Sequence, residues 1–574
     1  MARAFEFRAA LFSGLDGDLS EHADSHPGAS PDMLNFTVTP DGELIRRAGC
    51  ELLYQGSGVL RGMWCGALGT RTVYAAVFGN ALLRAETGFD ALTPVSGTVP
   101  GTEEVRFFPF MGALYLLTGA GILRFDGETL APIEPYEPTL TVATAPNGDG
   151  TPLEDINALT PRVAQRFIPD GTSTHYRLAA PEIGSVDRIE RGGEEIPHTQ
   201  WYWDDLSRAV VFLSAPARGG QDLVIHYRVM DHDPDLARRI LNCRYASAFG
   251  GAGDTRVFFY GCDEAPAVRY HSGMAGGLPD PAYVPVMNYT LIGDGSPVTG
   301  ILRHYDRQLI FTEKAAYYST LSYQTEADGR NRAIFPVLPL SDDRGNLPPG
   351  QPLLMENEPV TVTEAGLFRW VSTNVRDERN ARLFSRPVRE KLAAMDPRSL
   401  RLFNRKGEGE LYIAEGSEIL VYRYGTGAFY RYRLTGMTVL FLAERGSDLY
   451  LGTDRGICRA GGETDLDEPV PAYWTSPFLT LSHTGREKNL YAAVLCADTS
   501  AGAASCEFSL LTPEGTTPVR QTAQFPAGSR ARRCGFPARH GHFERVGTRI
   551  TAAGPGRLHL RFLVLRGKVC DKRI

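Results

Sequence analysis

Three short groups of polar residues in this sequence have types and spacings that could hold a metal ion. Residues 16–22 superficially resemble a calcium-binding loop, but such a loop needs a glycine at its sixth position and a glutamate at its twelfth, where Pro27 stands. His540 and His542 alternate along a basic segment, and residues 231–233 read Asp-His-Asp. We interpret these groups as a solvated loop, a basic turn and a polar linker, and we assign no metal ligand.

Signatures of catalysis are equally scarce. The sequence contains no G-x-S-x-G, no P-loop, no H-E-x-x-H and no G-x-G-x-x-G after a strand. The adjacent pairs 194–195 (Glu-Glu) and 204–205 (Asp-Asp) would point apart on a strand. If the two catalytic carboxyl groups of a glycosidase came from different sheets, they would show no characteristic spacing in the sequence. A glycosidase therefore stays possible. We predict no catalytic residue and no cofactor-binding residue, and we expect a protein that is not an enzyme.

Composition indicates which elements must carry any site. Glycine (61) and proline (38) together make about one residue in six of 574, spread along the chain, which indicates many turns. With 10% aromatic residues this composition is typical of an all-β protein. No apolar run reaches the 18 residues of a membrane span, and the first six residues lack the apolar core of a secretory signal. The nine cysteines form no C-x-x-C, so neither a disulfide framework nor a zinc cluster is expected.

Charge is unevenly distributed. Residues 520–574 contain 13 Lys and Arg against 2 Asp and Glu, a net charge of +11, whereas the whole chain carries −7 and the remainder therefore −18. A basic end on an acidic body indicates contact with nucleic acid or with an acidic partner. The alternatives are a solvated sheet face or a surface that docks on an acidic neighbouring subunit.

A degenerate internal repeat is the most informative feature of the sequence. Residues 114–124 align with residues 449–459 at seven of eleven positions, and each copy reads as a strand, a glycine-containing turn and a second strand. Weaker copies share this hairpin pattern. The marker residues of the seven hairpins are Tyr74, Tyr115, Phe258, Ile310, Thr361, Tyr412 and Tyr450. Their spacings are 41, 143, 52, 51, 51 and 38 residues, and all but one match the period of about 40–50 residues expected for propeller blades.

These spacings predict a β-propeller of six or seven blades, where the count depends on whether one blade is closed by strands from both ends. The long spacing predicts an inserted β-sandwich at 136–231, and strands beyond residue 463 predict a C-terminal β-sandwich that holds the basic excess. The predicted organisation is an N-terminal arm (1–40), a first propeller part (41–135), the insertion, a second propeller part (232–462) and the C-terminal domain (463–574). The alternative is a run of unrelated hairpins in one or two sandwiches.

Residues 33–49 resemble the N-terminal stretch of phage tail-nozzle proteins, also called packaged-DNA stabilisation proteins. In that family an Asn-containing strand is followed by a Gly turn and a basic pair before Pro-Gly; here Asn35, Gly42, Arg46, Arg47 and Gly49 match, and Ala48 replaces the proline. The likeness extends over most of residues 30–460, through stretches such as 298–317, 362–388 and 421–432.

The resemblance implies a structural protein of the virion tail, made in the cytoplasm of the bacterial host. Such proteins assemble as rings, commonly of six copies, below the portal and adaptor, and they enclose the channel through which double-stranded DNA leaves without sequence-specific contacts. An acidic lumen would repel DNA phosphates. The other parts would contact fibres, neighbouring subunits or other tail proteins. The alternatives are a tail-tip or fibre-attachment protein that binds a partner or a host glycan, and a polysaccharide-active propeller enzyme.

Overall fold

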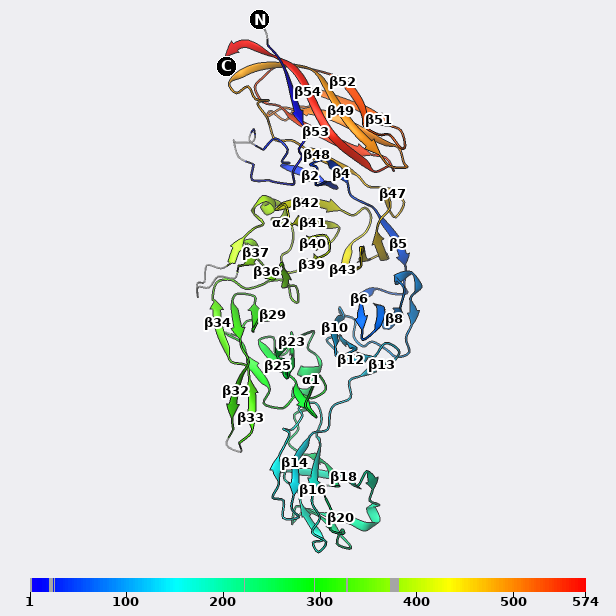
Figure 1. Ribbon diagram of the computed structural model, residues 1–574, viewed down its shortest axis with the longest axis vertical. Helices are drawn as coiled ribbons and strands as arrows, with labels where there is room; N and C mark the ends of the chain where they lie inside the picture. The colour runs from blue at the N-terminus through cyan, green and yellow to red at the C-terminus, as the bar shows by residue number, and fades with distance from the viewer. Residues whose placement is uncertain are drawn as a thin grey trace.

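The computed structural model describes residues 3–19, 24, 26–220, 222–293, 295–326, 329–371 and 381–573. The fold is all-β, as the composition predicted; in these ranges only α1 (Pro234–Leu241) and α2 (Arg389–Ala393) are α-helices. Three β bodies follow one another along the long axis of the molecule (Figure 1). We refer to them as the ring body, the inserted body and the terminal body.

The ring body consists, within the described residues, of seven antiparallel sheets that each contain four consecutively paired strands. The first sheet contains β6 (Leu60–Leu68), β7 (Arg71–Phe78), β8 (Ala81–Ala85) and β9 (Thr93–Pro94), and the second contains β10 (Arg106–Phe110), β11 (Ala113–Leu117), β12 (Ile122–Phe125) and β13 (Leu130–Pro132). The third sheet contains β23 (Tyr245–Gly251), β24 (Asp254–Tyr260), β25 (Val268–His271) and β28 (Tyr289–Leu291), and the fourth contains β29 (Val298–His304), β30 (Arg307–Thr312), β31 (Ala316–Ser319) and β34 (Val337–Ser341). The fifth sheet contains β35 (Leu353–Met355), β36 (Glu358–Thr363), β37 (Gly366–Trp370) and β38 (Ala381–Leu383). The sixth and seventh are β39 (Arg401–Arg405), β40 (Glu410–Glu415), β41 (Glu418–Arg423) and β42 (Ala428–Arg433); and β43 (Val439–Arg445), β44 (Asp448–Thr453), β45 (Gly456–Ala460) and β5 (Cys50–Tyr54), with β46 (Thr464–Asp465) and β47 (Glu468–Pro469) beyond β5.

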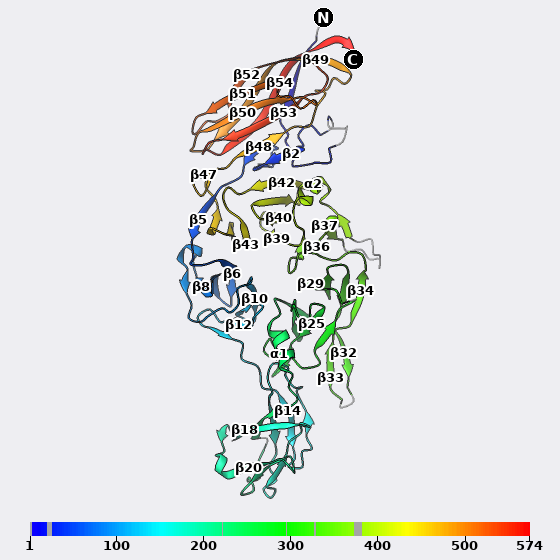
Figure 2. The same cartoon turned by 180° about the vertical axis from the view of Figure 1, so that it is seen from behind.

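These sheets surround a common centre (Figures 1 and 2). The first strand of each sheet contacts the next sheet in chain order, and β43 of the seventh contacts β6 of the first, so the circle is closed. The seventh sheet joins both ends of the ring body, because β45 pairs antiparallel with β5. All seven marker residues of the sequence repeat lie on the second strand of a different sheet.

Burial explains the apolar residues in the centre of the second strands, as in β11. In β11 every residue is buried. Leu114 and Leu116 pack with Val73 of the first sheet, whereas Tyr115 on the opposite face packs with Val257 of the third sheet. Because side chains alternate between the two faces of a strand, each sheet buries both faces only by packing between two neighbours.

The inserted body leaves the ring body after β13 and returns through α1. One of its sheets contains β14 (Thr139–Thr144), β15 (Thr151–Pro152), β16 (Arg162–Phe167), β18 (Ile183–Arg191), β19 (Glu194–Glu195) and β22 (Leu223–Val229), and the other contains β17 (His175–Arg177), β20 (Trp201–Asp204) and β21 (Ala209–Phe212). Residues from both sheets, among them Val163, Tyr176 and Tyr227, form one buried cluster. The segment 136–231 therefore carries its own core.

The terminal body combines both ends of the chain. One sheet contains β1 (Arg3–Ala9), β3 (Phe36–Val38), β4 (Leu44–Arg46), β49 (Arg486–Thr499), β52 (Arg532–Phe543) and β54 (Leu558–Arg573), and the other contains β2 (Asp32–Leu34), β48 (Ala472–Thr475), β50 (Ala504–Leu511), β51 (Val519–Phe525) and β53 (Gly547–Ala553). The sequence pattern predicted that residues 1–40 form an arm and that the propeller begins at residue 41. The structure differs, because the strands in this part of the chain belong to the terminal body. β1 and β4 pair with β54, and β2 pairs with β48, so the first strand of the chain to reach the ring body is β5.

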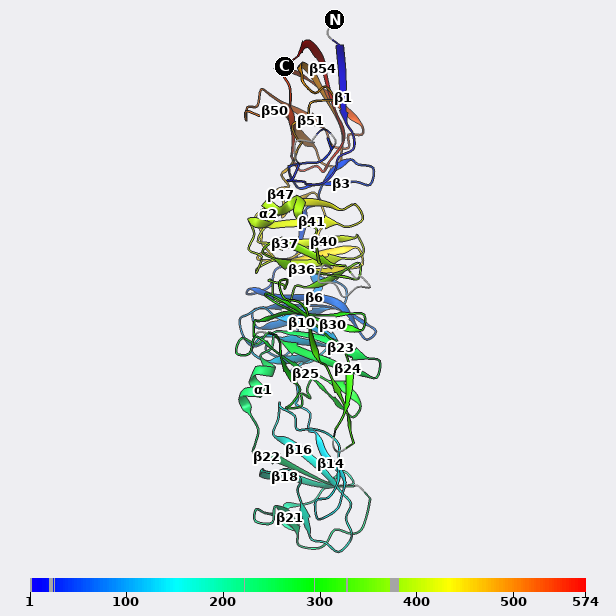
Figure 3. The same cartoon turned by 90° about the vertical axis from the view of Figure 1, so that its left-hand side faces the viewer.

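The terminal and inserted bodies project from opposite sides of the rim of the ring body, and the whole is narrow when seen edge-on (Figure 3). Two hairpins, β26 (Gly273–Ala275) with β27 (Leu278–Asp280) and β32 (Ser322–Thr325) with β33 (Asn331–Ile334), extend from the third and fourth sheets. Arg332 of β33 lies 3.6 Å from the carboxylate of Asp155 and so contacts the root of the inserted body. None of the helices within the described ranges has the length and apolar character needed to cross a membrane.

Candidate functional site

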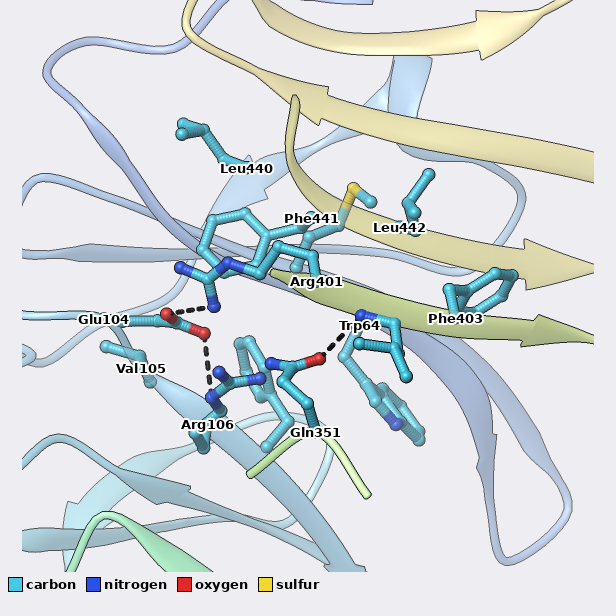
Figure 4. A pocket seen from close by; sticks show the side chains of 13 residues that line it. Trp64, Glu104, Val105, Arg106, Gln351, Arg401, Phe403, Leu440, Phe441 and Leu442 are labelled. Atoms are coloured by element: carbon cyan, nitrogen blue, oxygen red, sulfur yellow. Dashed lines mark hydrogen bonds and ion pairs between the residues drawn. The ribbon is translucent and has the colours of Figure 1, made fainter. Parts of the chain in front are cut away.

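A cavity of about 170 Å³ lies where the innermost strands of the ring body converge. Its walls come from four consecutive sheets, through β6, β10, β39 and β43, and from Gln351, just before β35 of a fifth sheet. The lining residues labelled in Figure 4 include the charged side chains of Glu104, Arg106 and Arg401. The geometry of the ring therefore brings together residues that are up to 379 positions apart in the sequence, from Met63 to Leu442.

The charges in this cavity form an ionic triad. Glu104 Oε1 lies 2.8 Å from Arg106 Nε, and Glu104 Oε2 lies 2.5 Å from Arg401 Nη1. The side chains of Glu104, Arg106 and Arg401 are about one quarter to one third exposed. One carboxylate thus holds two guanidinium groups, and the triad has a net charge of +1.

An aromatic ring packs against the guanidinium group of each arginine. The Arg106 guanidinium carbon lies 5.5 Å from the centroid of the Tyr245 ring, and that of Arg401 lies 5.8 Å from the centroid of the Phe441 ring. Tyr245 in turn stacks on Tyr260 at 5.2 Å, and burial raises the pKa of the Tyr245 hydroxyl. Such cation–π contacts leave the edges of the guanidinium groups available for hydrogen bonds.

Gln351 completes the polar wall and is only 7% exposed. Its Oε1 accepts a hydrogen bond of 2.9 Å from the backbone N–H of Leu402, which fixes the orientation of the amide. Glycine is required at the preceding position, because Gly350 has a φ of +70° and a Cβ there would lie 2.2 Å from the Tyr245 ring. The amide nitrogen of Gln351 therefore faces the cavity on the same side as the arginines (Figure 4).

The charged side chains of this cavity are one carboxylate and two guanidinium groups. Of the described residues that line the cavity, Glu104 is the only one with a carboxyl group. Glycoside hydrolysis uses two carboxyl groups that flank the scissile bond. Here both oxygens of the single carboxylate lie beside guanidinium groups.

A second cavity, of about 420 Å³, lies at the root of the inserted body and includes the Asp-His-Asp segment 231–233. His232 Nε2 lies 3.0 Å from the carbonyl oxygen of Ala158, and Asp233 caps α1 by accepting a hydrogen bond from the Asp235 N–H. These roles agree with a polar linker. The remaining wall is largely apolar and includes Met287, which is 67% exposed.

The other polar groups singled out in the sequence do not come together in a common site. His542 pairs with Glu487 at 3.0 Å, while His540 stacks on Phe543. Glu194 and Glu195 are exposed on β19. The calcium-like segment 16–22 lies partly outside the described residues. Across the described part of the chain, no three His, Cys, Asp or Glu side chains gather where they could hold a metal ion.

The Asn35, Arg46 and Arg47 positions, which carry the family resemblance, lie at the junction between the terminal body and the ring body. Arg46 is fully buried, and its guanidinium donates to four carbonyl oxygens, at Val470 and at Gly554, Pro555 and Gly556. Burial lowers the pKa of Arg46 to about 10. The side chain therefore acts as a structural donor that joins a turn of the terminal body to the linker leading into it.

Arg47 makes the other half of the junction. It forms two hydrogen bonds with Asp465, of 2.9 and 2.5 Å, and Asp465 is completely buried. Arg47 also donates to Asn35 Oδ1 at 2.9 Å and to the carbonyl oxygen of Arg433, the last residue of β42, at 2.7 Å. Gly49 follows, and a Cβ there would lie 1.9 Å from the carbonyl oxygen of Thr464. The types and spacing of Asn35, Arg46, Arg47 and Gly49 are thus explained by close packing between two bodies.

The basic excess of residues 520–574 lies in the terminal body, in β51–β54 and their connections. Part of it is neutralised locally, since Arg561 pairs with Asp498 at 2.7 Å and Arg566 with Glu6 at 2.9 Å. Arg533 and Arg8 lie over the Phe562 ring, at 5.7 and 4.4 Å from its centroid. All nine cysteines of the chain are free thiols.

Sequence reasoning missed Glu104, Arg106, Arg401 and Gln351. Glu104 lies just before β10 and Arg106 begins it, Gln351 lies just before β35, and Arg401 begins β39. Nothing in the immediate neighbours of these residues distinguishes them from ordinary polar residues. The usable signal is the repeat itself, because first strands of several repeats line the cavity at the centre of the ring body.

Comparison with known proteins gives little further information. No family model matches the chain, and no curated protein matches it. Among solved structures, the chain is similar to an exo-β-1,3-galactanase from Phanerochaete chrysosporium, with a TM-score of 0.21 and 8% sequence identity, over 91% of this chain and 100% of that chain. A likeness of this size assigns neither a detailed fold nor an activity.

Proposed function

We propose that the chain is a structural protein of a bacteriophage virion, the tail nozzle, and that its ring body is a seven-bladed β-propeller. In this role copies of the chain form a closed ring below the portal and adaptor and surround the DNA exit channel. The protein performs no chemistry of its own.

The observation that carries this proposal is the row of three bodies with oppositely charged ends (Figure 1). The inserted body, residues 136–231, contains 14 Asp and Glu against 8 Arg, whereas the last 55 residues of the terminal body carry a net +11. A subunit that presents a different surface at each end can contact a different neighbour at each end, as a connector in a tail must. Closed rings of identical subunits are the common way to build such a connector.

The electrostatics of the remaining chain agree with a DNA channel. Residues 1–519 carry a net charge of −18, and an acidic surface repels DNA phosphates. In this proposal the acidic part of the chain lines the channel and repels passing DNA. The partners in this proposal are further copies of the chain, the portal and adaptor, and tail fibres or other tail proteins at the two ends.

The ionic triad of Glu104, Arg106 and Arg401 supports a non-enzymatic role. A polysaccharide-active enzyme would place two carboxyl groups about 5–10 Å apart at the propeller axis. Glu104 instead lies between Arg106 and Arg401 and pairs with both.

The test is the mass of the purified chain by light scattering across a range of protein concentrations, with negative-stain images of the same samples. The proposal predicts closed rings with a mass of about six times the 62.9 kDa chain. A mass of one chain at every concentration, with no rings in the images, would overturn the assembly. Sugar release from a panel of polysaccharides that disappears in the E104Q variant would overturn the non-enzymatic role, and retention on a glycan without release would favour a tail-tip protein.

A further inference from the structure

We propose that the axial cavity of the ring body is a binding site for a small oxyanion of the carboxylate or phosphate class. The site consists of the guanidinium groups of Arg106 and Arg401 and the side-chain amide of Gln351. This inference does not depend on the proposed virion role.

The first argument is the excess of positive charge. Two guanidinium groups share the single carboxylate of Glu104, through contacts of 2.8 and 2.5 Å. Each arginine uses one N–H group on Glu104, and in the described part of the chain the remaining N–H groups of both side chains make no hydrogen bond. Two arginines held this close are stabilised by a second anion, because one carboxylate neutralises only half of their charge.

The second argument is the amide donor of Gln351, which faces the cavity. The side chain is 93% buried, yet its Nε2 has no hydrogen-bond partner among the described residues, while its Oε1 is occupied by the Leu402 N–H at 2.9 Å. This nitrogen is accessible from the cavity, so an anion held there can accept its hydrogen bond. Since the orientation of the amide is fixed, the vacant group is a donor and therefore selects an acceptor ligand.

The third argument is size. A cavity of about 170 Å³ holds a phosphate or a short carboxylate but excludes a sugar chain or a nucleotide. Apolar rings, among them Phe441, line the rest of the wall, and their low polarity strengthens charge-assisted hydrogen bonds inside the cavity. The oxyanion can be a free ion or the carboxylate of an Asp, a Glu or a C-terminus of another chain.

Two isosteric substitutions should change the binding affinity in opposite directions. The affinity is measured by isothermal titration of the full-length protein with inorganic phosphate and, separately, with succinate. Gln351→Glu keeps the acceptor for Leu402 but replaces the donor with a negative charge, and we expect affinity to fall at least tenfold. Glu104→Gln removes the internal counter-charge and frees both arginines, and we expect affinity to rise about tenfold. Glu128→Gln, an exposed pair partner of Arg71 in the same ring body, serves as the matched control and should change affinity less than twofold.

The two directions together separate a binding site from a merely structural cluster, because a variant that disturbs folding would lower affinity in both cases. Binding by the wild-type protein with opposite shifts in the two variants supports the site. Titration heats that are absent in both the wild type and the Glu104→Gln variant, or affinities that are equal in all variants, would overturn it. Phosphate or succinate that competes with ring assembly, measured by light scattering, would indicate that the carboxylate of another chain is the occupant; binding without effect on assembly would indicate a free ion.

Discussion

The buried ion pair between Arg47 and Asp465 should decide whether the terminal and ring bodies move as one. Asp465 is 0% exposed and Arg47 6%, so each charge depends on the other for solvation. Asp465 also accepts from the Thr435 N–H at 3.0 Å, which extends the contact into the loop after β42. We choose Asp465→Asn as the perturbation, since it removes the charge and preserves the shape.

The magnitude follows from the geometry. Removing one partner of a buried pair leaves the other charge uncompensated, which typically costs about 3–5 kcal/mol. At about 1.4 kcal/mol per factor of ten, this corresponds to an increase of about a hundredfold to a few thousandfold in the population of the open junction. Arg47→Met should have an effect of similar size, and the double variant with Asp465→Leu should cost much less than the sum of the two single changes.

Hydrogen exchange is the appropriate assay, because a multi-domain chain need not unfold in one step and local opening is measured directly. We expect faster exchange at the Thr435 amide and in β46, with exchange in the centre of β11 unchanged. The control is Glu51→Gln on the neighbouring strand β5, whose partner Arg459 lies 3.0 Å away at the surface; this exposed pair should contribute less than about 1 kcal/mol. Exchange rates in the Asp465→Asn variant within twofold of the wild type would refute the reasoning.

Three further changes test other parts of the fold. Gly49→Ala should destabilise the junction by about 1–3 kcal/mol in thermal melts, because its Cβ meets a backbone carbonyl at 1.9 Å, whereas Gly461→Ala, which meets nothing within 4 Å, should be neutral. Burial lowers the pKa of His271 to about 3, so the stability that this neutral ring contributes is present above pH 6.5 and lost as pH falls toward 3. His271→Phe should flatten the pH dependence of the melting temperature in that window; an unchanged slope would contradict this. Deleting β1 should leave the edge of β54 unpaired and promote aggregation on heating, measured by light scattering.

The repeat could be recognised from the sequence because its physics is local. Each hairpin pairs strands that are separated by a short glycine-containing turn, as in β44 and β45, where Thr453 pairs with Gly456. The turn fixes the register, and the alternation of side chains fixes which residues are buried. Both signals lie within about a dozen residues, so degenerate copies remain detectable even when few identities are kept.

The terminal body and the axial site could not be recognised in the same way. β1 pairs with β54, more than 550 residues away, and no turn links the two strands. The sequence of β1 alternates in burial like any half-exposed strand and carries no information about its partner. The axial residues come from separate repeats, and their shared location follows only from closure of the ring, which depends on the number of sheets and their mutual packing.

The adjacent arginines at positions 46 and 47 show how a short motif can encode a long-range contact. Neighbouring residues of an extended chain point in opposite directions, so the two guanidinium groups reach different surroundings. Arg46 satisfies carbonyl groups of the terminal body at Gly554 and Gly556, and Arg47 pairs with Asp465 beside the ring body. Lysine could not replace either residue, because an ammonium group lacks the planar, multi-donor geometry that four carbonyl oxygens or a bidentate carboxylate require. The basic pair is therefore explained by its position between two bodies, and its charge serves their mutual orientation and not the binding of an external anion.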